Sequence, residues 1–95
     1  MTRFEASVPT AHASRYLQQL CKHWSHRFEV TFDATSGEVR MTGATCRFEA
    51  APERLSLYLE GEDAAALPRL CGVVADHLKR FAFREDLAVE WREAA

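Results

Sequence analysis

The sequence has no large excess of charge of either sign and no long apolar run. Its 95 residues carry 12 Lys and Arg against 14 Asp and Glu, which gives a formal net charge of −2. Because no basic block is present to neutralise phosphates, the charge gives little support to nucleic-acid binding. No apolar stretch approaches the roughly 20 residues that a membrane-spanning helix needs. The N-terminus, with Glu5 and no apolar core, does not resemble a signal peptide. We therefore expect a soluble, cytoplasmic protein.

Cysteine is scarce, and its number is odd. Cys21, Cys46 and Cys71 are widely spaced. This is neither the pattern of a disulfide framework nor that of a structural zinc site with two tight ligand pairs. We expect three reduced thiols, at least two of them packed as small apolar side chains.

A complete catalytic motif is missing as well. The four glycines are scattered and form no phosphate-binding loop, and the carboxylates show no acid/base pair. Cys21 and His23 are too close in sequence to hydrogen-bond along a regular helix. A pairing of Cys46 with His26 or His77 has no support in the pattern. A Cys/His-dependent enzyme is therefore the least favoured function.

The apolar residues that are present follow two periods, one typical of strands and one typical of helices. The length fits a single domain over residues 1–95 with one core. The elements expected in chain order are a strand over 3–8, a helix from about 10 to 26, strands near 28–33, 39–42, 46–50 and 55–60, a helix from about 63 to 81, and a strand over 87–92.

The order β-α-β-β-β-β-α-β predicts an α+β fold with an antiparallel sheet. Each strand has one apolar face and each helix one apolar stripe, so two helices covering one face of the sheet would bury all of them. The order is similar to the TATA-binding-protein-like (TBP-like) arrangement with an added strand, and a ferredoxin-like variant is the alternative. Thr10 and Asp63 are the expected helix N-caps, and Gly37 is free to take a positive φ in the first hairpin turn.

One flank of the first predicted helix carries a line of polar side chains at spacings of four and three residues. Its members are His12, Tyr16, Gln19, His23 and His26. His23 and His26 form an H-x-x-H pair, which on a helix could share an iron or zinc ion. The alternative is that these cationic groups only offset the dipole at the end of the helix.

The second predicted helix ends in a further histidine among cations. His77 is followed by Arg80 and Arg84. If the C-terminal ends of both helices lie side by side, His23, His26 and His77 would converge with these guanidinium groups. Such a site would suit an anionic ligand, whereas capping and a solvated face remain the simpler interpretation.

Two stretches resemble the signature segments of a bacterial family of small domains of unknown function. They are Tyr16–His26 and His77–Glu85, and residues 8–10 and 32–37 fit the opening and the first hairpin of that family. Its members are often encoded beside, or fused to, siderophore-interacting flavin reductases. The resemblance therefore implies an accessory role in iron or siderophore handling, with a reductase as a partner in trans, and it assigns no catalytic residue.

The leading hypothesis is a non-enzymatic module that binds a small ligand or metal species. Its candidate residues are Tyr16, His23, His26, His77, Arg80 and Arg84, with His23 and His26 as the metal ligands. The alternative is a protein–protein interaction module that docks a partner, or a second copy in a homodimer, on the sheet face opposite the helices. Alternating residues such as Arg40, Glu49 and Glu60 predict a mixed, partly charged surface there.

Overall fold

The fold is one six-stranded antiparallel sheet with two helices. The computed structural model describes residues 1–94. Its elements in chain order are β1 (Thr2–Pro9), α1 (Ala13–Trp24), β2 (Glu29–Phe32), β3 (Ser36–Met41), β4 (Ala44–Ala51), β5 (Arg54–Gly61), α2 (Leu67–Phe81) and β6 (Arg92–Ala94). The predicted α+β class and the predicted order of elements are confirmed.

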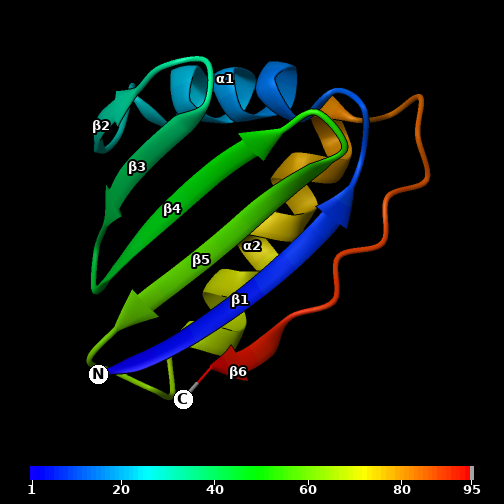
Figure 1. Cartoon of the computed structure of the whole chain (residues 1–95). Helices are drawn as coiled ribbons and strands as arrows, with labels where there is room; N and C mark the ends of the chain where they lie inside the picture. Colours follow the sequence, from blue (N-terminus) through cyan, green and yellow to red (C-terminus); the bar gives the residue numbers. More distant parts are fainter. Residues whose placement is uncertain (95) are drawn as a thin grey trace.

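The first strand lies inside the sheet, between β5 and β6. The strand order is β2-β3-β4-β5-β1-β6, and all neighbouring pairs are antiparallel. Both helices lie behind the sheet in the view of Figure 1, and the face toward the viewer carries no helix of residues 1–94. The likeness to the TBP-like or ferredoxin-like arrangement stays a prediction.

The core fills the space between the sheet and the helices. Every second residue of each central strand points into it, and the buried strand residues include Val8, Val39, Cys46, Phe48, Leu55, Leu57 and Leu59. From α1, Trp24 stacks on Phe48 of β4 with ring centroids 6.1 Å apart and an interplanar angle of 20°. Burying a side chain of this size contributes roughly 1.5–3 kcal/mol, so the apolar faces determine how the helices sit on the sheet.

Both helices begin later than predicted, and neither predicted N-cap is correct. His12 precedes α1 as its N-cap residue, and Ala66 precedes α2. The Thr10 hydroxyl accepts a hydrogen bond from the His12 N–H at 3.1 Å, in the turn before the helix. The Asp63 carboxylate accepts one from the Ala65 N–H at 3.0 Å. Threonine and aspartate stabilise such turns in the same way as they cap helices, so their positions alone do not distinguish the two.

The first hairpin turns on Asp33, and the predicted role of Gly37 in that turn is wrong. The Asp33 carboxylate accepts hydrogen bonds from the N–H groups of Thr35 and Ser36, each at 2.8 Å. These bonds, that to Thr35 first, hold the pKa of Asp33 below its usual value. Gly37 lies within β3, and among residues 1–94 the single positive φ, 83°, belongs to Gly43.

The last strand is shorter than predicted and begins later. The alternation over residues 87–92 correctly identifies side chains that face the core, since Leu87 is buried and Val89 and Trp91 pack against it. Residues 86–91 nevertheless run without strand pairing, and only residues 92–94 pair with β1. Alternation reports which side chains are buried and not whether the backbone forms a ladder.

The close contact between α1 and the sheet requires a residue without a side chain at Gly37. A Cβ at this position would lie 2.7 Å from the Cys21 Sγ. Gly37→Ala should therefore lower the free energy of unfolding in urea by about 1–3 kcal/mol. Gly72→Ala is the matched control, because nothing lies within 4 Å of a Cβ there and the residue is inside α2. It should raise the free energy of unfolding by about 0.5–1 kcal/mol. Equal effects at the two glycines would contradict the packing argument.

Candidate functional site

Two of the predicted site histidines meet between the helices. His23 lies in the last turn of α1, and His77 lies about one turn before the end of α2. Their ring centroids are 5.2 Å apart with an interplanar angle of 41°. The end of α1 thus lies against the last turns of α2, and the pair connects residues that are far apart in the sequence.

The orientation of the His77 ring is fixed by its neighbours. Its Nδ1 lies 2.8 Å from the Val73 carbonyl oxygen, which can only accept, so Nδ1 carries a proton. In the neutral ring the lone pair is then on Nε2. Trp24 lies 5.2 Å from the His77 ring and Phe81 lies 5.8 Å from the His23 ring, centroid to centroid. Both imidazoles thus lie against aromatic rings, with His23 exposed and His77 half-buried.

His26 lies just beyond α1, whereas the sequence predicted a helix that includes it. α1 ends at Trp24, and His26 lies in the following turn with its side chain exposed. A metal ion shared by His23 and His26 stays a prediction. Arg80 is exposed on α2, and the Arg84 guanidinium lies over the Phe83 ring at 5.6 Å.

Tyr16 belongs to a different cluster, toward the N-terminal end of α1. Its hydroxyl donates to the Glu85 carboxylate, and the Thr10 hydroxyl lies 3.1 Å from both oxygens of the same group. Burial, and then the hydrogen bond to Glu85, raise the pKa of Tyr16. The cluster ties the segment after α2 to α1. Sequence reasoning missed Glu85, which is 69 residues from Tyr16.

The two histidines alone do not form a complete metal site. Within the part of the chain that the structure describes, no group of three or more His, Cys, Asp and Glu side chains is placed to hold an ion. His23 and His77 could supply two nitrogen ligands. Any further ligands would have to come from water or from a bound small molecule.

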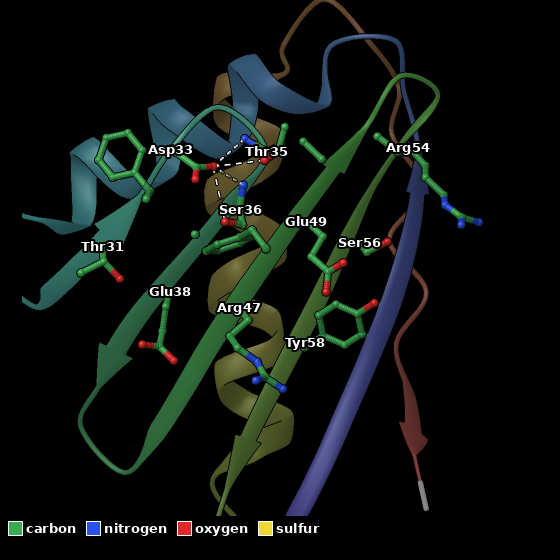
Figure 2. A pocket seen from close by; sticks show the side chains of 15 residues that line it. Thr31, Asp33, Thr35, Ser36, Glu38, Arg47, Glu49, Arg54, Ser56 and Tyr58 are labelled. Atoms are coloured by element: carbon green, nitrogen blue, oxygen red, sulfur yellow. Dashed lines mark hydrogen bonds between the residues drawn. The ribbon is translucent and has the colours of Figure 1, made fainter.

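The face of the sheet without helices is hollowed beside the β2–β3 turn. The hollow has a volume of about 870 Å³, and Figure 2 shows Arg47, Glu49 and Tyr58 over it. Arg47 pairs with Glu60 at 3.2 Å, and the Arg3 guanidinium lies 4.8 Å from the centre of the Tyr58 ring. Side chains of both charges line this face, so it is mixed and partly charged. Sequence reasoning foresaw the character of the surface but not the hollow.

All three cysteines are buried. Burial raises the pKa of Cys21 and of Cys71 to about 11 and that of Cys46 further. Because the thiolate is the nucleophile, these thiols are held in their unreactive form.

None of the helices in residues 1–94 is long and apolar enough to cross a membrane.

The buried thiols should react slowly with a thiol reagent. At neutral pH we expect Ellman's reagent to modify the native protein at a rate at least about a hundredfold below that of the protein unfolded in urea, since a pKa near 11 leaves little thiolate. Absorbance at the wavelength of the released thiol measures both rates. A thiol that reacts fast in the native protein would contradict this expectation and would favour a Cys/His-dependent enzyme.

The hydrogen bond between Tyr16 and Glu85 should stabilise the fold. Tyr16→Phe is expected to lower the free energy of unfolding by about 1.5–3 kcal/mol, as for a bond to a charged acceptor. Tyr58→Phe on the uncovered face is the matched control and should change it by less than about 0.5 kcal/mol.

The same bond should give an alkaline pH dependence. Because the pKa of Tyr16 is raised above 10.0 on folding, the unfolded chain loses this proton first, and stability should fall as the pH rises above about 10. Urea unfolding at several pH values would measure this slope, which should be smaller in Tyr16→Phe. An unchanged slope in the variant would show that another group is responsible.

The comparisons with known proteins identify a family. A family model described as an uncharacterized protein conserved in bacteria (DUF2218) matches residues 5–92. The chain is also similar to the NMR structure of PA4090 from Pseudomonas aeruginosa, with a TM-score of 0.82 and 37% sequence identity over 97% of this chain and 96% of that chain. No functionally curated protein matches. The predicted membership in a bacterial family of unknown function is thus confirmed, and the chain belongs to the uncharacterized bacterial family DUF2218.

Proposed function

We propose that this protein is a non-enzymatic binding module that takes up a chelated transition-metal ion between α1 and α2, with His23 and His77 as protein ligands. The observation that supports the proposal is the 5.2 Å separation of the two rings. The Nδ1–H of His77 bonds to the Val73 carbonyl. Metal-binding histidines usually donate their second ring nitrogen in this way, which orients the other nitrogen for the ion.

The separation of the rings suits a shared ion. A ring nitrogen binds zinc at about 2.0–2.1 Å, so the centroids of two imidazoles on one tetrahedral ion lie about 5–6 Å apart. Imidazole is a good ligand for zinc, copper, nickel and iron, whereas it is a poor one for calcium and magnesium.

The small number of protein ligands favours an ion that arrives with others already bound. Two nitrogens leave a tetrahedral or octahedral ion with open positions, which a small oxygen-donor chelator would fill. Arg80 follows His77 by three residues on α2, where its guanidinium could pair with a carboxylate of the chelator. Arg84, three residues after the end of α2, is a further candidate of the same kind.

A role in iron or siderophore handling follows from this proposal together with the family resemblance of the sequence. A metal complex held by two imidazoles can be passed on without unfolding the protein, which fits an accessory carrier in the cytoplasm. The association with a siderophore-interacting flavin reductase in trans is part of the proposal and rests on the resemblance alone.

Docking of a protein partner on the uncovered sheet face is less well supported. The Arg92 guanidinium already binds the Glu5 carboxylate at 2.7 and 3.1 Å, and Arg47 binds Glu60. A partner would have to replace these ion pairs, which lowers the gain from docking.

Nickel nitrilotriacetate is a sharp probe of the proposed site, because this chelate leaves adjacent positions open for imidazoles. We expect the untagged protein to bind it, measured by calorimetry and by quenching of Trp24 fluorescence, since the Trp24 ring lies 5.2 Å from that of His77. Zinc, ferrous iron and ferric citrate would be titrated in parallel. His23→Gln and His77→Gln should each weaken binding by about a hundredfold or more.

Two matched variants separate the proposed pair from a general effect of histidine. His12→Gln and His26→Gln each remove an exposed histidine of α1 or its flanks and should leave the affinity within about twofold of wild type. Binding that is lost in His26→Gln but kept in His77→Gln would favour the pair on one helix instead. No binding of any of the metal species would reject the proposed function.

A further inference from the structure

One edge of the sheet leaves a strand open to pairing with another chain, although this strand is short and carries the charge of Glu29. β2 is the outermost strand and pairs with β3 alone. It has neither proline nor lysine, and the Phe32 side chain is 38% exposed. Natural edge strands are usually protected by such residues, by a bulge or by a covering segment. At the opposite edge, β6 has only three residues.

The backbone groups of β2 that point outward can be identified from the hairpin. The Asp33 N–H donates to the Ser36 carbonyl at 2.8 Å, in register with the β2–β3 ladder. In an antiparallel pair, bonded and non-bonded residue pairs alternate. The odd-numbered residues of β2 therefore bond to β3, whereas the N–H and C=O groups of Val30 and Phe32 point away from the sheet.

We propose that β2 pairs antiparallel with β2 of a second copy of this chain, about a two-fold axis at Val30. On this register Val30 lies opposite Val30 of the second copy, and Phe32 of each copy comes opposite Phe28 of the other, which directly precedes β2 and already donates its N–H to the Trp24 carbonyl. Val30 and Phe32 face the helix-covered side, since Val39 and Gly37 opposite them in β3 are buried. The phenylalanines would cover one another, and aromatic cross-strand pairs stabilise sheets.

The charges along the edge select this register over its neighbours. With the axis at Val30, Glu29 lies opposite Thr31 of the second copy. With the axis at Glu29, its carboxylate would lie opposite Glu29 of the second copy. With the axis at Thr31, Glu29 would lie opposite Asp33 of the second copy. Like charges directly opposite each other destabilise a strand pair, so both alternatives are disfavoured.

The expected dimer is weak because the edge is short. β2 has four residues, and strand pairing of this length buries less surface than a standard stable interface. Association should therefore depend on concentration, with a dissociation constant of about 10 µM to 1 mM. The site between the helices takes no part in this pairing, so failure of the dimer would not contradict the proposed metal binding, nor the reverse.

Sedimentation equilibrium over this concentration range, together with concentration-dependent amide shifts, tests the proposal. Wild type should shift from monomer to dimer, with the largest NMR changes at residues 28–33. Phe32→Lys places a charge at the edge and should weaken the dimer by about tenfold or more. Phe83→Lys is the matched control, because Phe83 is 75% exposed in another part of the molecule, and it should leave the dimer unchanged.

Cross-linking tests the register itself. Val30→Cys would bring two thiols together at the axis, where paired backbones lie within the Cα separation that a disulfide spans, and should form a covalent dimer on mild oxidation. Val73→Cys on α2, where Val73 is 37% exposed, should not. The proposal is overturned if wild type stays monomeric throughout, if Phe32→Lys and Phe83→Lys dimerise equally, or if both cysteine variants cross-link alike.

Discussion

The contacts of Trp24 hold the three parts of the molecule together. Its indole stacks on Phe48 of β4 and lies beside His77 of α2, while its backbone ends α1. One side chain therefore sets the end of the first helix against both the sheet and the second helix. The proximity of His23 to His77 follows from this arrangement, because His23 precedes Trp24 directly in the last turn of α1.

The other end of α1 is fixed by different chemistry. There the Glu85 carboxylate accepts hydrogen bonds from the hydroxyl groups of Tyr16 and Thr10. These bonds join the segment after α2 to the beginning of α1. An aromatic contact at one end and a polar one at the other fix the position of α1 relative to α2. Rigid placement of this kind lowers the cost of ordering two imidazoles around a ligand.

The sequence was sufficient to predict the elements but not their contacts. The periodicity of apolar residues located the helices and strands, because the burial of one face of each element determines this periodicity. Leu87 shows the limit of the method, since it is buried and fits the alternation but belongs to no strand. The sequence singled out His23 and His77 separately, whereas the contact between their rings depends on how the two helices pack. Tyr16 shared the spacing of the histidines, and only the fold revealed that Glu85, distant in sequence, binds it.

The position of β1 between β5 and β6 has a consequence for the order of folding. The β2–β5 meander forms by pairing neighbours in the chain, which costs little loop-closure entropy. β1 is the earliest strand of the sheet in the chain but pairs with residues 54–61 and 92–94, so its main ladder needs the chain through residue 61 and its pairing with β6 needs almost all of it. We expect the meander to form early and the closure of the sheet by β1 to limit the folding rate.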